Sequence, residues 1–209
     1  GVAGNVATEQ VVAWAEKALG DLPAGGEDPA MERPGGNAKT TYQAKEIEQV
    51  HFCIGGDGTS LFDDELYTAS VLDAALGGSM SSRLFQEIRE KRGLAYAIGS
   101  YTLSYSAGGA YTVYGGTARE TWDEVQALVR AEFDKVMQEG LPSEELDRTK
   151  RHICGGIVLA LEGMSSRMMR MSKNELVHRR EIPIEETIGK VNAVTNAQIV
   201  ELARRVLDQ

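Results

Sequence analysis

The chain begins with a pattern typical of an amphipathic helix. The apolar positions recur three and four residues apart, which places them on one helical face: Val11, Val12, Ala15 and Leu19. Thr8 is a suitable N-cap, and Gly20 is a suitable end. We therefore predict a helix over residues 8–19.

A turn-rich stretch follows this helix. Residues 21–37 read DLPAGGEDPAMERPGGN and contain three prolines and four glycines. Such a composition favours a linker over a packed element. We predict that residues 1–21 are the tail of a preceding half-domain, that residues 22–41 are an interdomain linker, and that residues 42–209 form the main domain.

The main domain starts with strand patterns and continues with helical ones. Apolar and β-branched residues predict strands over 48–55, 94–105 and 110–114, with a hairpin turn at 106–109. Helical spacing covers most of the remainder, at residues 61–76, 82–91, 121–139, 143–162, 165–179, 184–191 and 196–207. This segregation of strands from helices predicts an α+β fold, with a mixed, largely antiparallel sheet and helices packed on one face.

Several helix starts carry residues that suit an N-cap. Ser60 precedes the first helix of the main domain, and Asp63 is an imperfect capping-box partner for it. Thr121, Ser143 and Ser165 are the corresponding candidates for three later helices.

Charge and cysteine content narrow the function classes. A formal net charge of −9 argues against sequence-independent binding of nucleic acid, which needs a basic surface. No apolar run approaches the roughly 20 residues that span a bilayer, so the cytoplasm is favoured, with the compartment left open.

Cys53 and Cys154 stand far apart and outside any CxxC pair, which favours buried thiols over a disulfide or a metal site. The chain does not begin with methionine, so a removed leader and a piece of a longer protein both fit.

The sequence lacks the usual catalytic signatures. It contains neither HExxH nor HxxEH, and its glycine pairs form no nucleotide-binding loop. The three histidines, His51, His152 and His178, fall on separate predicted elements. We therefore predict no metal and no other cofactor site within this chain.

One turn does gather polar side chains suited to a reaction. In IREKRGLAY, residues 88–96, Gly93 allows a sharp turn that brings Arg89 near Tyr96. Both side chains donate hydrogen bonds at neutral pH, as a peptide carbonyl or its oxyanion requires. The alternative is that Arg89 pairs with a surface carboxylate while Tyr96 packs half-buried, and spacing alone favours this alternative.

The stretch LGGSMSSRLFQEIREKRGLAYAIGSY, residues 76–101, resembles the second half of the pitrilysin/insulinase family of zinc peptidases. That family includes the mitochondrial processing peptidase. GNVATEQVVAWAEKALGDLP is similar to the closing strand and helix of the family's first half, and EIEQVHFCIGG to the opening strand of the second. The later helices are similar to its helical return. The resemblance covers nearly the whole chain, and a further strand usually follows the closing helix in the family.

The resemblance implies a fold like that of LuxS and the processing peptidases, in which two halves enclose a peptide. The first half carries HxxEH and binds zinc, while the second half holds no metal and supplies an arginine and a tyrosine to the substrate. These residues correspond to Arg89 and Tyr96 here. A helix of one half also packs on the sheet of the other, a role that the apolar face of residues 8–19 could fill.

The resemblance therefore implies that this chain is the inactive, non-zinc C-terminal domain of a zinc metalloendopeptidase. Zinc is expected in the missing N-terminal half, which is then a partner together with a peptide substrate; no nucleic acid or membrane is expected. The alternative is a structural or scaffolding relative, such as the non-catalytic subunit of a heteromeric peptidase or a respiratory core protein. An HxxEH motif upstream would favour the peptidase.

Overall fold

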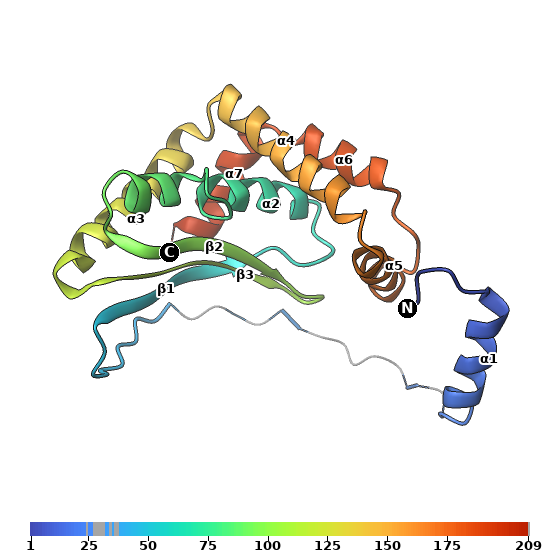
Figure 1. Ribbon diagram of the computed structural model, residues 1–209. Coiled ribbons are helices and arrows are strands. Elements are labelled where there is room, and N and C mark those ends of the chain that lie inside the picture. The colour runs from blue at the N-terminus through green and yellow to red at the C-terminus, as the bar shows by residue number, and fades with distance from the viewer. Residues whose placement is uncertain (24, 27–31, 34, 36–37, 209) are drawn as a thin grey trace.

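A computed structural model of the chain describes residues 1–23, 25–26, 32–33, 35 and 38–208. Its centre is an antiparallel sheet of three strands in the order β1-β3-β2 (Figure 1). The strands are β1 (Gln49–Gly58), β2 (Ala95–Ser104) and β3 (Gly109–Ala118). β2 and β3 form the predicted hairpin, and each strand predicted for the main domain is present. All described pairings are antiparallel, so the sheet has no mixed part within this region.

Helices make up most of the rest and cover one face of the sheet (Figure 1). The α+β class and the one-sided layer of helices are thereby confirmed. The α-helices are α1 (Thr8–Leu19), α2 (Leu66–Leu76), α3 (Trp122–Glu139), α4 (Ser143–Ala160), α5 (Met164–His178), α6 (Ile184–Ala193) and α7 (Asn196–Leu207). A short π-helix, η1 (Phe85–Glu90), precedes β2, and a 3-10 turn, η2 (Arg119–Thr121), precedes α3. None of the described helices is long and apolar enough to cross a membrane.

The two faces of the sheet differ because alternate residues of a strand point in opposite directions. Phe52 and Val113 are buried beneath the helices, whereas Tyr101 and Tyr114 lie on the open face. Cys53 follows Phe52 and is therefore exposed. The prediction that Cys53 is buried was wrong, because the sheet is covered on one side only.

The hydrophobic core lies between the sheet and the helices α2, α3 and α7. α7 supplies five buried apolar residues, and α3 packs directly against it. The largest fully buried side chains include Leu72, Leu76, Leu84, Ile88, Ile199 and Leu202. Leu84 and Ile88 belong to the segment before β2, so the core fixes the element that carries Arg89.

The start of α2 differs from the sequence prediction. The predicted helix began at residue 61, but α2 begins at Leu66. Ser60 and Asp63 do form capping-type hydrogen bonds, since the Ser60 amide donates to Asp63 Oδ2 over 2.7 Å. These bonds stabilise a turn ahead of the helix instead of its first turn. The backbone bond from Ser60 also lowers the pKa of Asp63.

The predicted N-caps at Thr8, Ser143 and Ser165 were wrong by one or two residues. The N-cap positions belong to Ala7, Pro142 and Gly163, and none of these helices has a side-chain cap bond. Thr121 does occupy the N-cap of α3, but its hydroxyl bonds to Thr117 and Ala118 instead.

The N-terminal segment stands apart from the core. α1 has the predicted bounds but buries none of its residues, and Val12 and Leu19 are about half exposed. Residues 1–7 form no strand, since no neighbouring strand lies beside them. The predicted linker falls partly outside the described residues. The apolar face of α1 therefore has no partner within the described part of the chain.

Candidate functional site

Arg89 lies on a widened turn of helix just before β2. In η1 the Lys91 amide donates to the Gln86 carbonyl over 3.0 Å, which is the i→i+5 bond of a π-helix. Single π turns of this kind are frequent at functional sites. The turn ends at Gly93, whose φ of 64° is in the left-handed region that favours glycine. The chain then enters β2 directly.

Tyr96 lies at an irregularity in the pairing of β2 with β3. Ala95 pairs with Thr117 and Ala97 pairs with Gly116, so Tyr96 is the extra, unpaired residue of a β-bulge. A bulge bends the strand and redirects a side chain. Tyr96 is 78% exposed as a result, although its neighbour Ala95 is buried.

The structure brings the two predicted site residues together. The guanidinium carbon of Arg89 lies 5.3 Å from the centre of the Tyr96 ring and 4.8 Å from that of Phe85. This is within the range of a cation–π contact. The nearest carboxylate is that of Glu90, at 4.0 Å from Arg89 Nε, the outer limit for an ion pair. Arg89 thus stacks on two aromatic rings and makes only a marginal ion pair with Glu90.

The surroundings hold this pair of side chains in place. The Thr117 hydroxyl donates to the Leu94 carbonyl over 2.6 Å and fixes the start of β2. Arg83, two residues before η1, donates to both carboxylate oxygens of Glu145, at 2.9 and 2.7 Å. This bidentate pair is largely shielded from water, where such bonds are strong and specific in geometry. The backbone that carries Arg89 and Tyr96 is therefore anchored on both sides.

A half-buried carboxyl group, that of Asp73, joins α2 to the middle of β2. The Ser100 hydroxyl donates to Asp73 Oδ1 over 2.6 Å. Burial raises the pKa of the Asp73 carboxyl, and the hydrogen bond from Ser100 partly opposes that shift. Gly77 is required beside this contact, because an added Cβ would lie 2.5 Å from the Ser100 amide nitrogen. The close approach ties the strand to the end of α2.

The pair suits binding of a carbonyl group and lacks a group for proton transfer or nucleophilic attack. Within the described residues, the Tyr96 hydroxyl and the Arg89 guanidinium make no hydrogen bond to the protein. Both are donors, and neither needs to lose a proton to donate. Donors of this kind stabilise the negative charge that develops on a peptide carbonyl oxygen. The reacting group would have to come from elsewhere.

The described residues offer no metal centre. No group of three or more His, Cys, Asp or Glu side chains lies close enough together there to hold a metal ion. His51 lies on β1, His152 on α4 and His178 at the end of α5.

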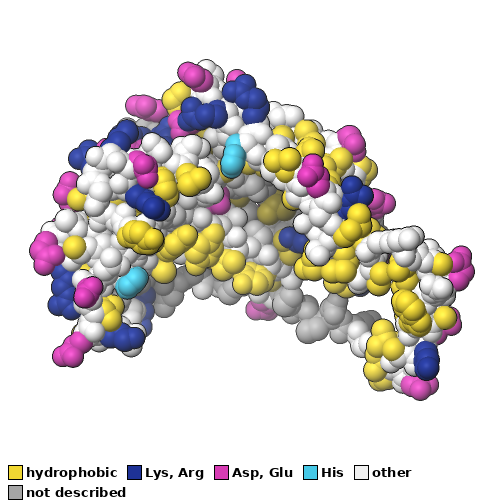
Figure 2. Space-filling view, viewed as in Figure 1, with side chains coloured by type: hydrophobic (Ala, Val, Ile, Leu, Met, Phe, Trp, Pro, Cys, Tyr) yellow, Lys and Arg dark blue, Asp and Glu magenta, His cyan; other side chains and the backbone are white. Residues whose placement is uncertain are grey.

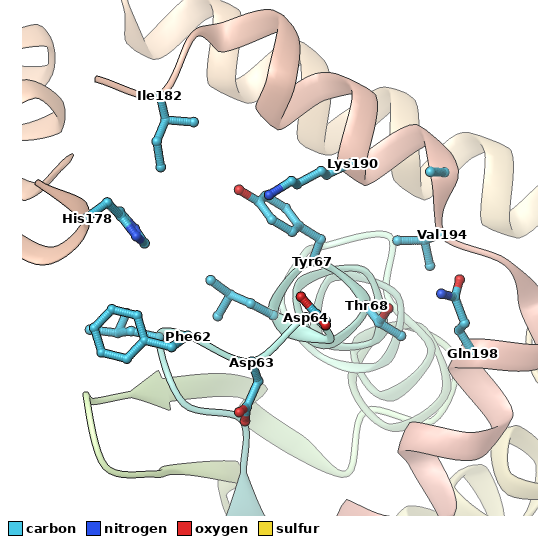
Figure 3. Close-up of a pocket in the computed structure, with 13 residues that line it drawn as sticks. Phe62, Asp63, Asp64, Tyr67, Thr68, His178, Ile182, Lys190, Val194 and Gln198 are labelled. Atoms are coloured by element: carbon cyan, nitrogen blue, oxygen red, sulfur yellow. The ribbon is translucent and has the colours of Figure 1, made fainter. Parts of the chain in front are cut away.

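A hollow of about 310 Å³ lies at the other end of the domain (Figure 3). It is lined by the segment before α2, the end of α5 and the helix α6. Among its charged groups, Lys190 lies over the Tyr67 ring and pairs with Glu186, and Asp63 accepts from the Ser60 amide. A neighbouring hollow is lined by residues 102–105, which lie at the end of β2 opposite to Tyr96. The hollow is therefore separate from the Arg89–Tyr96 pair.

The sequence indicated the turn and both side chains, but it missed the π-helix and the β-bulge. The bulge depends on where β2 pairs with β3, a strand that follows later in the chain. No local motif in residues 88–96 signals an unpaired position. Long-range pairing thus decides how far Tyr96 projects.

Comparison with known proteins gives the family. Residues 1–153 match the sequence model described as the peptidase M16 inactive domain. An uncharacterized zinc protease of Bacillus subtilis, YmxG, is 35% identical over all of this chain and 51% of its own length. An uncharacterized zinc protease of Streptomyces coelicolor is 34% identical over 98% of this chain and 46% of its own length.

Solved structures agree on the fold. A protease from Helicobacter pylori superposes with a TM-score of 0.85 at 17% identity, over 98% of this chain and 51% of the other. The chain thus spans about half the length of the relatives it matches. The chain therefore belongs to the peptidase M16 inactive-domain family and corresponds to its C-terminal half.

Proposed function

We propose that this chain supplies substrate-binding donors to a zinc peptidase site whose metal lies in the other half of the same protein or in a partner subunit. Arg89 and Tyr96 donate hydrogen bonds to the scissile carbonyl of a peptide. The zinc half supplies the metal-activated water. The chain on its own neither binds zinc tightly nor cleaves peptides.

One observation carries this proposal. The β-bulge turns Tyr96 out to 78% exposure beside Arg89, while the backbone on both sides of the pair is anchored in the core. A tyrosine that served only to pack would be expected to bury its ring. Two free donors on a rigid support are what electrostatic stabilisation of an oxyanion requires. The zinc-protease names of the relatives support the reaction class.

The second candidate is a structural or scaffolding relative that keeps the fold without a catalytic role. The absence of a metal-binding group among the described residues fits this candidate equally well. The exposed Arg89–Tyr96 pair favours the peptidase, because a scaffold has no need for unpaired donors there.

Metal analysis together with a peptidase assay on the full-length parent tests the proposal. We expect one zinc per parent chain, cleavage of unstructured peptides, and loss of cleavage when a chelator removes the metal. Residues 1–209 expressed alone should hold no stoichiometric zinc. A tight zinc site within residues 1–209, or a parent that holds zinc and cleaves no peptide, would contradict it.

A further inference from the structure

The helix α5 is oriented with its polar side inward. Arg170, Asn174 and Val177 recur at helical spacing and face the rest of the domain. Asn174 is the one buried residue of the helix, and Arg170 donates to the Ile182 carbonyl and the Thr187 hydroxyl over 2.9 and 3.0 Å. Helices on the surface of a domain normally turn their apolar side inward. α5 reverses this arrangement.

The exposed positions of α5 include four large apolar side chains. We call these four, together with the half-buried Met168, the outer face of α5: Met164, Met168, Met169, Met171 and Leu176. Met169 is 63% exposed and Leu176 is 74% exposed. Figure 2 shows apolar side chains gathered over the region where Figure 1 places α5 and α1. Contiguous exposed apolar surface of this kind marks an interaction site.

The N-terminal segment already rests on this face. The backbone of Gly1 lies against α5, because an added Cβ would be 1.8 Å from the Ser172 hydroxyl and 3.4 Å from the Met168 carbonyl. α1 follows within a few residues and also exposes its apolar side chains, Trp14 at 61% among them. The chain thus leads from α5 to α1, and both helices expose apolar side chains.

We infer that the outer face of α5, together with α1, is the surface on which the zinc-binding half of the parent protein docks. This inference rests on the proposed function for the identity of that half. The relatives are about twice as long as the chain, so a second half of similar size exists in them and needs a surface to pack against. The segment that begins at Gly1, which rests on α5, leads along the chain to α1. The apolar face of α1 also has no partner among the described residues.

Methionine suits such a surface. Its unbranched, polarizable side chain adapts to irregular apolar partners. Four of the five residues of the outer face are methionines. Oxidation of a methionine by peroxide requires access to its sulfur, so these residues also report whether the surface is covered.

Peroxide oxidation of the native full-length parent, followed by mass spectrometry of each methionine, tests the inference. Met80 is 76% exposed on a loop and serves as the fast control; Met137 packs against the core and serves as the slow control. We expect Met169 and Met171 to react at least about tenfold more slowly than Met80, the factor that about 1.4 kcal/mol of protection gives. Their rates should approach that of Met137.

Two results would overturn the inference. Oxidation of Met169 and Met171 at the rate of Met80 would show that the face is uncovered. Protection that vanishes on dilution, as a dimer dissociates, would make the occupant a second copy of the chain. The zinc and peptidase assays are separate readouts. A parent that holds zinc and cleaves peptides while these methionines react fast would refute the docking surface alone.

Discussion

The helices α5 and α7 are both amphipathic, yet they meet the rest of the domain in opposite ways. α7 buries Ile199, Leu202 and three further apolar residues against α2, α3 and the sheet. α5 buries Asn174 and leaves three of its four methionines exposed. The comparison teaches that an amphipathic pattern predicts a helix but does not say which part of the protein covers the apolar side. The apolar side of α7 is covered within this domain, whereas most large apolar side chains of α5 remain exposed.

The largest expected difference between the two helices is in stability. Leu202→Ala on α7 removes a fully buried side chain and should lower the free energy of unfolding by about 2–5 kcal/mol. Met171→Ala on α5 should change it by less than about 0.5 kcal/mol, because that side chain is half exposed in residues 1–209. Denaturant unfolding of both variants gives the two values. Equal losses would abolish the distinction between the helices.

The inward side of α5 should depend on hydrogen bonds in place of apolar burial. Arg170→Met removes the bonds to Ile182 and Thr187 and should lower the free energy of unfolding by about 1–3 kcal/mol. Lys173→Met, on the exposed side of the same helix, is the matched control and should have little effect. Thermal unfolding of the two variants is the measurement, and a stabilised Arg170→Met would show that the inward side favours apolar residues after all.

The starts of the two helices should also differ. Thr195 caps α7 in a capping box with Gln198, so Thr195→Ala should cost about 1 kcal/mol of stability. Ser165 makes no cap bond at the start of α5, and Ser165→Ala should cost a few tenths of a kcal/mol at most. Chemical denaturation resolves the pair. A larger loss from Ser165→Ala would reverse the assignment of caps.

A smaller effect should appear in the pH dependence of stability. It arises at Asp73 on the helix α2, which packs against α7. The pKa of Asp73 is raised in the folded state, so the folded chain retains this proton to a higher pH than the unfolded chain does. Its contribution to stability therefore falls as pH rises through the folded pKa. Asp73→Asn should remove that fall while keeping an acceptor for Ser100. The free energy of unfolding of Asp73→Asn minus that of wild type, measured from pH 4 to 8, isolates this group and should grow as pH rises. A value that shrinks as pH rises would contradict the sign.

Much of the fold follows from local sequence patterns. Alternation and helical spacing predicted every strand and helix of the main domain, because each pattern is set by the period of one element. The N-caps and the start of α2 were less well predicted. Ser60 and Asp63 form the same hydrogen bonds in a turn as in a helix start, so the sequence alone cannot separate the two.

The candidate site was predicted in identity but not in geometry. Gly93 signalled the turn, and the resemblance to zinc peptidases singled out Arg89 and Tyr96. The exposure of Tyr96 results from a bulge against Thr117 and Gly116, residues that follow it by a whole hairpin. The outward orientation of α5 depends likewise on Arg170 finding acceptors beyond the end of its own helix. The exposure of Tyr96 and the orientation of α5 therefore depend on contacts between segments that are far apart in the sequence, which local patterns do not reveal.

The role of Tyr96 as a donor to the substrate is the central claim, and the turnover of Tyr96→Phe in the full-length parent tests it most directly. The variant keeps the ring beside Arg89 and removes only the hydroxyl. Loss of one oxyanion donor should lower kcat roughly 100- to 1000-fold with KM little changed. Tyr105→Phe, an exposed tyrosine at the far end of β2, is the matched control and should retain full turnover. A Tyr96→Phe parent with wild-type kcat would contradict the account.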